Sequence, residues 1–180
     1  MLGGNVGDRM VYLHQSIDLL RREVGQVIAM SAVYESEPWG YEDMHWYLNQ
    51  MVVMKTGLAP FKLLESIQQI EQCLGRVRTC DGYQARTVDI DILLYDNIVI
   101  NTPELMIPHP RMTERMFVLQ PMTEIAPNLK HPVLHHTMKY LKKHCTDTKQ
   151  VKVTDLSHKF DPSMQKRFPT VHLPASCARC

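Results

Sequence analysis

The nine residues from Thr87 to Tyr95 alternate strictly between two kinds of position, and this pattern constrains the fold more than any other segment. One set is wholly apolar and the other begins with two carboxylates: Val88, Ile90, Ile92 and Leu94 against Asp89, Asp91, Leu93 and Tyr95. A period of two predicts a β-strand, because successive side chains of a strand point to opposite faces. Aspartate is disfavoured inside strands. The segment therefore predicts a strand with one face on a core and an acidic face that favours a functional site.

Helical periodicity marks two longer segments. After a cap at Asp8, one apolar stripe consists of Met10, Leu13, Ile17, Leu20 and Val24, and it ends at Gly25. A second helix begins at Pro60 and stops at Gly75, with a stripe made of Leu63, Leu64, Ile67, Ile70 and Leu74. Shorter segments are predicted as strands at 27–35 and 47–55, a hairpin turn at Asp96–Asn97 into residues 98–100, and short helices at 112–119 and 137–143.

The order helix, strand, strand, helix, strand, strand is most of a ferredoxin-like α+β fold, in which helices cover one face of an antiparallel sheet. That fold begins with a strand. Only Met1 and Leu2 precede the turn predicted at Gly3–Gly4–Asn5, so the first strand is expected to be truncated. We expect one domain over residues 1–145. Residues 146–180 are polar without sustained periodicity, which predicts a poorly ordered C-terminal extension.

Composition excludes several classes of protein. The 180 residues carry 20 Lys and Arg against 19 Asp and Glu, a net charge of +1, which argues against nucleic-acid binding by bulk electrostatics. No apolar run approaches the roughly 20 residues that span a bilayer, and no secretory leader is recognised at the start. Five cysteines without an export signal favour a reducing, cytoplasmic setting rather than a disulfide framework. Cys177 and Cys180 form a terminal CxxC, for which a frayed tail is the alternative to a metal or redox site.

Two charged groups of residues suggest phosphate chemistry. Asp89 and Asp91 lie two apart, which places both carboxylates on one strand face, where they repel unless a cation such as Mg²⁺ lies beside them. Guanidinium groups match phosphate geometry. Four arginines flank the acidic pair along the chain: Arg76, Arg78, Arg86 and Arg115. A solvated edge strand and an ordinary exposed loop are the corresponding alternatives. Together the groups favour a cradle for a metal and a polyphosphate.

Aromatic side chains gather in the first long loop, residues 36–46, and just after it. Trp39, Tyr41, Trp46 and Tyr47 are followed by Asn49, a combination that would hold a flat heterocycle by stacking and by amide hydrogen bonds. Core packing is the alternative, above all for Tyr47. His109 stands between two prolines that stiffen its backbone, and it is either a phosphate ligand or a structural histidine.

Taken together, the chain resembles the 6-hydroxymethyl-7,8-dihydropterin pyrophosphokinase family of folate synthesis. The matching motifs follow the family's order and spacing over about residues 2–143: Leu2–Arg9, Tyr47–Asn49, Ile70–Glu71 with Gly75–Arg78, Arg86–Ile92, Pro108–Met112, Glu114–Arg115 with Phe117–Leu119, and Pro121 with Glu124–Pro127. The sequence departs from the family in Gly4, where serine is usual, in Thr113, where histidine is frequent, and in Gln84–Ala85. The absent first strand is the largest departure.

The resemblance implies Mg²⁺-dependent transfer of diphosphate from ATP to the pterin hydroxymethyl group, with release of AMP. By the resemblance, Asp89 and Asp91 hold two Mg²⁺ ions and act in catalysis with Arg76 and Arg86. It places five residues at ATP, namely Gln68, Arg78, Ile92, His109 and Arg115, and five at the pterin, namely Glu37, Trp39, Tyr47, Asn49 and Phe117. It implies a cytoplasmic, monomeric enzyme without nucleic-acid or membrane partners. The alternative is a catalytically impaired relative that binds nucleotide or pterin without efficient turnover.

Overall fold

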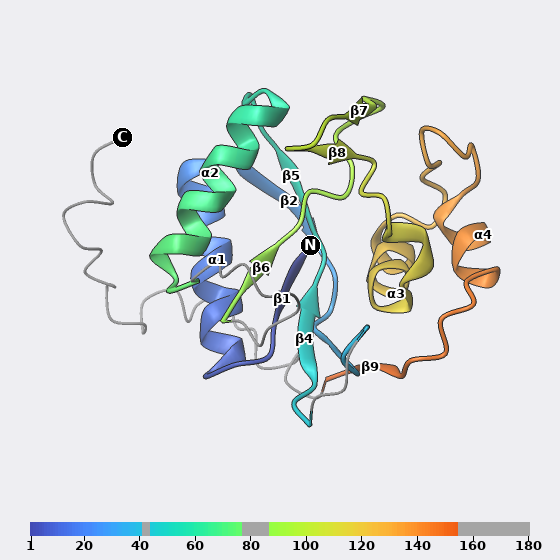
Figure 1. The fold of residues 1–180 in the computed structure, drawn as a ribbon, viewed down its shortest axis with the longest axis horizontal. Helices are drawn as coiled ribbons and strands as arrows, with labels where there is room; N and C mark the ends of the chain where they lie inside the picture. The colour runs from blue at the N-terminus through green and yellow to red at the C-terminus, as the bar shows by residue number, and fades with distance from the viewer. Residues whose placement is uncertain (41–43, 77–86, 155–180) are drawn as a thin grey trace.

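The computed structural model describes residues 1–40, 44–76 and 87–154. Its main feature is a five-stranded antiparallel sheet with strand order β6-β1-β4-β3-β9, flanked by helices (Figure 1). The elements run in chain order β1 (Leu2–Gly4), α1 (Arg9–Glu23), β2 (Gln26–Met30), β3 (Tyr34–Ser36), β4 (Tyr47–Gln50), β5 (Val52–Lys55), α2 (Pro60–Cys73), β6 (Asp89–Ile90), β7 (Ile100–Asn101), β8 (Met106–Ile107), the 3₁₀ turn η1 (Met112–Glu114), α3 (Met116–Ile125), α4 (Met138–Lys143) and β9 (Val151–Val153). The expectation of an α+β fold with an antiparallel sheet is confirmed.

The two long helices form where their caps and stripes predicted them. Asp8 accepts a hydrogen bond from the backbone N–H of Val11, and Pro60 occupies the first turn of α2. Gly25 ends the first helical segment at φ +151°, where an added Cβ would come within 2.3 Å of the Lys55 carbonyl oxygen. Glycine is therefore required at this position both by the backbone angle and by the close approach of β5.

The strands predicted at 27–35 and 47–55 exist, but each is broken in the middle. β3 pairs with β4 in the main sheet, whereas β2 pairs with β5 in a separate two-stranded sheet. The break is stabilised at Ser31, whose hydroxyl oxygen accepts from the Met51 N–H while its carbonyl accepts from the Gln50 amide. Side-chain hydrogen bonds thus satisfy the backbone where the ladder is interrupted, and apolar periodicity alone does not reveal such a break.

The prediction of a missing first strand was wrong. β1 includes Gly3 and Gly4 themselves and pairs on both sides, with β4 and with β6. Met1 extends the second pairing, since its amino group donates to the Asp91 carbonyl at 2.8 Å and its carbonyl accepts from the Asp91 N–H at 2.9 Å. Glycine has a low strand propensity, which indicated a turn, but two flanking strands outweigh that preference.

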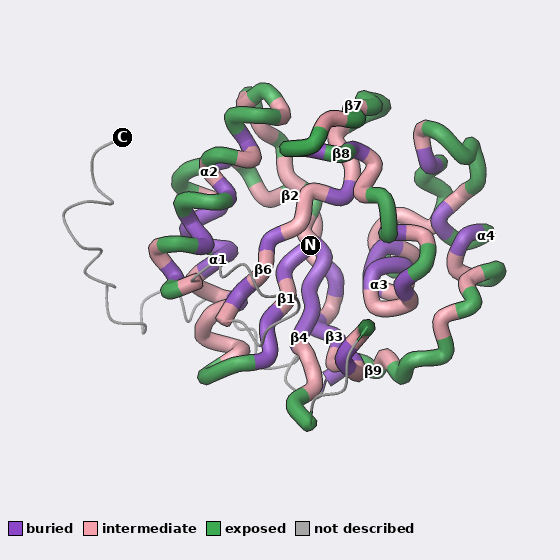
Figure 2. The backbone as a smooth tube through the Cα atoms, viewed as in Figure 1, coloured by how far each residue is buried: buried purple, intermediate pink, exposed green. Residues whose placement is uncertain are grey.

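The sheet has a hydrophobic core on each face, so the expectation of helices on one face only was also wrong. Leu13, Ile17 and Ile67 of α1 and α2 pack with Leu2 and Ile90 of the sheet. The second core joins α3 and α4 to the sheet, and it consists of Met1, Met51, Leu93, Met112, Val118, Leu119, Met122, Met138 and Leu141. Figure 2 shows buried backbone on both flanks of the central strands.

The alternation predicted from Thr87 holds as far as Leu93 and then ends. Val88, Ile90 and Ile92 pack in the first core and Leu93 packs in the second, as predicted. The last two residues are exchanged: Leu94 packs in the second core and Tyr95 in the first. The strand itself is short, since β6 covers Asp89–Ile90. The turn at 96–97 is present, with the Ile98 N–H bonded to the Tyr95 carbonyl. The segment that follows it pairs with β8 and not back onto the preceding strand, so the predicted hairpin was wrong.

The C-terminal part of the described chain differs from the sequence prediction in two respects. The helix predicted at 112–119 is η1 followed by α3, which continues to Ile125, whereas the helix predicted at 137–143 is confirmed as α4 with Thr137 as its cap. β9 lies within the stretch predicted to be a poorly ordered extension, yet it pairs with β3 and is part of the main sheet. Terminal CxxC residues 177–180 lie outside the described residues.

Two further findings concern cysteines and membranes. Cys73, at the end of α2, is disulfide-bonded, and Cys145 is free. Among the described residues, every helix is too short or too polar to traverse a bilayer.

Candidate active site

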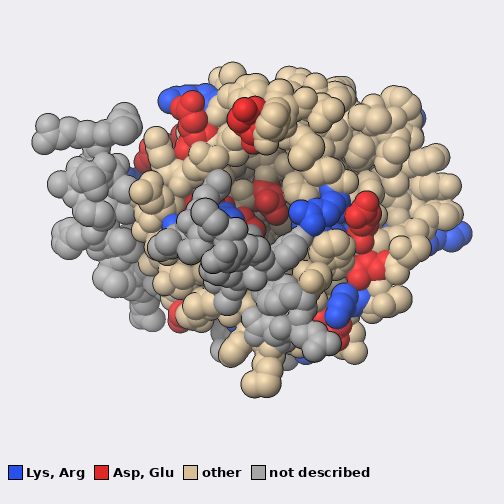
Figure 3. Space-filling model, in the orientation of Figure 1, with Lys and Arg blue, Asp and Glu red and all other residues tan. Residues whose placement is uncertain are grey.

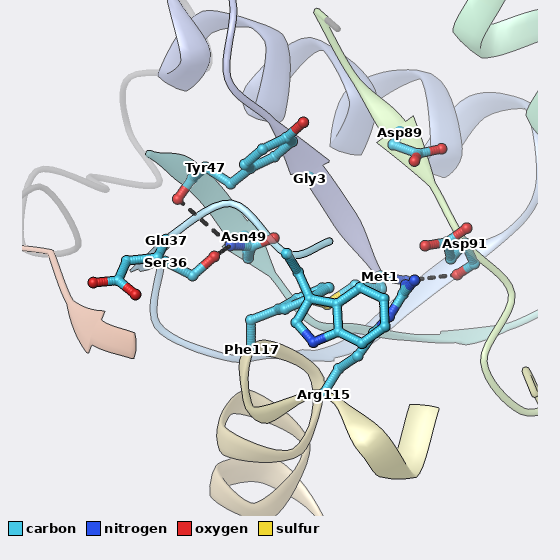
Figure 4. A pocket seen from close by; sticks show the side chains of 11 residues that line it. Met1, Gly3, Ser36, Glu37, Tyr47, Asn49, Asp89, Asp91, Arg115 and Phe117 are labelled. Carbon is cyan, nitrogen blue, oxygen red and sulfur yellow. Dashed lines mark hydrogen bonds between the residues drawn. The ribbon is translucent and has the colours of Figure 1, made fainter. Parts of the chain in front are cut away.

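One pocket brings together most of the predicted site residues. Asp89 of β6 and Asp91 just after it lie on one side, Tyr47 and Asn49 of β4 lie on the other, and Arg115 and Phe117 extend from the start of α3 (Figure 4). Eight of its eleven lining residues were predicted: Glu37, Trp39, Tyr47, Asn49, Asp89, Asp91, Arg115 and Phe117. Residues more than 100 positions apart in the chain therefore share one cavity.

Sequence reasoning gave no role to the other three lining residues, which are Met1, Gly3 and Ser36. Met1 and Gly3 lie in or next to β1, the strand that was expected to be missing. Ser36 carried no signal, because a single serine at a strand end is too common to indicate a site.

The acidic pair lies in surroundings that oppose a second negative charge. Burial raises the pKa of Asp91, and the neighbouring Asp89 carboxylate raises it further, against the opposing effects of His109, the amino group of Met1 and Arg115. Asp89 is compensated by Arg76, whose Nη1 lies 2.5 Å from its Oδ1. The two carboxylates therefore differ. Asp89 has an arginine partner, whereas Asp91 is half-buried and nearby positive charges do not fully offset the effect of burial on its pKa.

Arg76 is itself held by Glu71, a residue whose role was not predicted. Its guanidinium forms an ion pair with the Glu71 carboxylate, and the same Glu71 oxygen accepts from the Ile90 N–H at 2.8 Å. Glu71 is 2% exposed. The signal for it was present in the sequence, because Glu71 falls four residues after Ile67 and three before Leu74, on the apolar stripe of α2. A buried carboxylate of this kind is retained only with partners.

The opposite wall of the pocket presents an amide and several aromatic rings. Asn49 Nδ2 donates to Ser36 Oγ at 2.8 Å, which fixes the orientation of the side-chain amide. Its Oδ1 lies 3.2 Å from the position that a Cβ on Gly3 would occupy. β1 therefore approaches Asn49 so closely that a side chain on Gly3 would disturb it.

Arg115 lies at the start of α3, on a further side of the pocket, and contacts two aromatic residues. Its guanidinium carbon is 4.5 Å from the ring centre of Trp39 and 5.6 Å from that of Phe117, and the residue is 8% exposed. Cations stack favourably on aromatic faces in this way. The structure thus places Arg115, which was predicted at ATP, beside two residues that were predicted at the pterin.

The remaining predicted residues lie outside the pocket lining or outside the described residues. His109 is close enough to Asp91 for their charges to interact, although burial dominates and lowers the pKa of His109. Ile92 packs in the first core, and Gln68 is exposed on α2. Arg78 and Arg86 lie outside the described residues. On the face drawn in Figure 3, acidic side chains occupy a central hollow with basic side chains at one side.

The donor set of the pocket fits a hard divalent cation bound together with a ligand. Two carboxylates on one strand face supply oxygen atoms, and the raised pKa of Asp91 means that a positive charge at the pair would stabilise its ionised form. In the described ranges, no group of three or more His, Cys, Asp or Glu side chains is arranged to hold a metal. Oxygen atoms of a bound polyphosphate are of the ligand type that a hard cation prefers.

Comparison with known proteins agrees with this geometry. Residues 1–127 match the model of the family described as 7,8-dihydro-6-hydroxymethylpterin-pyrophosphokinase. The 2-amino-4-hydroxy-6-hydroxymethyldihydropteridine pyrophosphokinase of Bacillus subtilis (strain 168) is 48% identical over 126 residues, which cover 69% of this chain and 75% of that protein. The enzyme of the same name from Aquifex aeolicus is 40% identical over 141 residues, covering 78% and 87%.

Solved structures match the fold at lower sequence identity. A crystal structure of wild-type Plasmodium falciparum HPPK-DHPS with pteroate superposes with a TM-score of 0.66 at 18% identity, covering 79% of this chain. The match spans 43% of that longer chain. This likeness supports the fold alone.

Proposed function

The chain belongs to the 7,8-dihydro-6-hydroxymethylpterin-pyrophosphokinase family, and on this basis we propose how its pocket carries out the family's reaction. The chain is an ATP-dependent pyrophosphokinase that transfers diphosphate from ATP to 6-hydroxymethyl-7,8-dihydropterin in folate biosynthesis. In this reaction the hydroxymethyl oxygen attacks the β-phosphorus of ATP. The bond from that phosphorus to the α-phosphate oxygen breaks, AMP leaves, and the hydroxyl proton is lost.

Asp89 and Asp91 would hold Mg²⁺ in this proposal, next to the phosphates of ATP. Bound there, Mg²⁺ would supply positive charge against the negative charge of the transferred group. Both carboxylates line the same pocket, Asp89 from β6 and Asp91 from the residue that follows it. Arg76 meets the phosphates as a guanidinium already oriented by Glu71 and Asp89, so less side-chain entropy is lost when ATP binds.

The pterin lies between the aromatic residues and the Asn49 amide. Asn49, oriented by Ser36, hydrogen-bonds the polar edge of the ring, and Tyr47, Trp39 and Phe117 contact its faces. This arrangement directs the hydroxymethyl group toward Asp89 and Asp91 on the opposite wall. The pocket orients the acceptor and the phosphates with respect to each other, which is the main contribution that a protein makes to phosphoryl transfer.

We also assign the strand order to the ferredoxin-like class and the active unit to a monomer. If β2 with β3, and β4 with β5, are each counted as one broken strand, the chain has four main strands. In the sheet these strands lie in the order fourth, first, third, second, and each pair of neighbours is antiparallel. The alternative of an impaired relative was based on an absent first strand, and the presence of β1 removes that basis.

The observation that carries the mechanism is that Asp89 and Asp91 open onto the same pocket as Asn49 and Phe117. The test measures AMP formation from ATP and 6-hydroxymethyl-7,8-dihydropterin, and calorimetric binding of a non-hydrolysable ATP analogue with and without Mg²⁺. We expect Asp89→Asn and Asp91→Asn each to lower turnover by about 100-fold or more and to abolish the Mg²⁺-dependent part of binding. AMP formation unchanged in both variants would refute the assignment.

Asp96→Asn provides the matched control. Asp96 is exposed in a turn at φ +46°, a conformation that asparagine tolerates well, so this variant makes the same chemical change far from the pocket. It should keep wild-type turnover. Wild-type protein that binds both substrates without releasing AMP would instead support the impaired relative.

A further inference from the structure

We propose that the segment from Asp147 to Val153 is a positioning element for the pterin half of the pocket, because it connects the two walls that hold the ring. This inference rests on the proposed function of that pocket. The segment lies beyond residue 127, where the match to the family model ends, and none of its residues lines the pocket. In Figure 1 the chain leaves α4, passes beneath α3 and reaches β9 beside the sheet.

The first wall is tied to the segment through β3. β9 pairs with β3 in register, with Val151 opposite Ser36, and Ser36 is the residue that orients Asn49. The pairing continues past the strand ends, since the Glu37 N–H donates to the Gln150 carbonyl at 3.2 Å. The Gln150 N–H in turn donates to Glu37 Oε2 at 3.4 Å. Two lining residues, Ser36 and Glu37, are therefore backed by this segment.

The second wall is tied to the segment through the start of α3. The residue at the helix N-cap position is Arg115, which makes no side-chain capping bond there. The cap comes from Asp147, whose Oδ2 accepts from the Met116 N–H at 2.8 Å. Its Oδ1 accepts from the Lys149 N–H at 3.1 Å, which fixes the carboxylate in place. A carboxylate at a helix N-terminus both satisfies a free N–H and interacts favourably with the helix dipole.

The position of this cap relates it to ligand binding. Met116 stands between Arg115 and Phe117, and both of those residues line the pocket. Asp147 thus fixes the backbone from which two pocket side chains extend, while Gln150, three residues later, fixes Glu37 on the facing wall. Asp147 acts through these residues without touching the ligand, so it is a positioning residue. Loss of the cap should loosen the pterin site more than the acidic pair, Asp89 and Asp91.

The experiment compares full-length wild type with Asp147→Ala, Asp147→Asn and Thr148→Ala. Thr148 is exposed and next in sequence, so its variant is the matched control. Dissociation constants for the pterin at saturating ATP analogue, and for the ATP analogue with Mg²⁺, are measured by tryptophan fluorescence and calorimetry. KM and kcat are measured on the same preparations.

Asp147→Ala should raise Kd and KM for the pterin by about tenfold and leave the Kd of the ATP analogue within about twofold. Asp147→Asn keeps an acceptor oxygen without the charge, so its affinity for the pterin should lie between those of wild type and Asp147→Ala. If the alanine variant does not fold, the asparagine variant still tests the inference. Thr148→Ala should match wild type. If Asp147→Ala weakened the binding of both ligands equally, or changed the binding of neither, the positioning role would be overturned. The proposed function would still stand in that case, provided that the wild type turns over. A wild type that fails to bind the pterin would refute both.

Discussion

At the residue scale, the close approach of β1 to Asn49 gives the sharpest prediction. A Cβ on Gly3 would lie 3.2 Å from Asn49 Oδ1, and Ser36 restrains the other end of that amide. Gly3→Ala should therefore displace the amide and weaken pterin binding by about fivefold to tenfold, the equivalent of one hydrogen bond. Titration of the intrinsic fluorescence with the pterin measures this change.

Gly57→Ala is the control for that substitution. Apart from its chain neighbours, no atom of the described residues lies within 4 Å of the position that its Cβ would occupy, so the same chemical change should leave pterin affinity unchanged. If Gly3→Ala also binds the pterin as tightly as wild type, the close contact does not determine the position of the Asn49 amide.

Glu71 is the residue on which the connection between α2 and β6 depends. Glu71→Ala leaves the Arg76 guanidinium without its buried partner and removes the acceptor for the Ile90 N–H. We expect a loss of about 3 kcal/mol in the free energy of unfolding. Glu71→Gln retains an acceptor oxygen and should lose less. The free energy of unfolding is measured by urea denaturation. Values equal to that of wild type for both variants would contradict the prediction.

At the scale of elements, the loop before α4 depends on a neutral histidine. His131 is buried, and its Nδ1 accepts from the N–H groups of Val133 and Leu134 at 3.3 and 3.1 Å. Burial, and then the charge of His135, lower the pKa of His131 below 6.5. As pH falls through 6.5, the unfolded chain takes up a proton that the folded chain does not, so this histidine contributes stability above pH 6.5 that is lost toward lower pH.

His131→Asn tests this dependence, because asparagine supplies an acceptor oxygen that does not titrate in this range. The difference in unfolding free energy between wild type and variant should narrow from pH 7.5 to pH 5. Between pH 7.5 and 8.5 it should stay constant, since neither state of His131 binds a proton there. A difference that is constant down to pH 5 would show that the imidazole is not held neutral by the fold.

At the scale of the whole molecule, the central sheet should make the two cores unfold together. Leu13 belongs to the first core and Leu119 to the second, and both are almost fully buried. Each leucine-to-alanine change should lower the free energy of unfolding by about 3 kcal/mol. In both variants circular dichroism and tryptophan fluorescence should report the same single unfolding transition. Leu134→Ala, at a residue that is 46% exposed, is the control and should have little effect. A separate early transition in Leu119→Ala would show that the second core unfolds independently.

Much of the site was predictable because its chemistry is local in sequence. Asp89 and Asp91 are two residues apart, so any strand through them places both on one face, and the pocket contains both. Tyr47 and Asn49 were predicted from a different local pattern, the aromatic residues and the amide in and just after the first long loop. Glu71 was missed although its place on an apolar stripe marked it, and Ser36 and Asp147 were missed because their partners are remote in the chain.

The sequence by itself determined where the two long helices begin and end, which residues face the first core, and which acids share a strand face, because caps, stripes and alternation depend on neighbours a few residues away. Tertiary structure alone decided that the glycines of β1 form a strand, that the long strands break at Ser31 and Met51, and that β9 completes the sheet. In each of these cases, hydrogen bonds to segments distant in sequence satisfy backbone groups whose local preference is weak, so no short window of residues contains the answer.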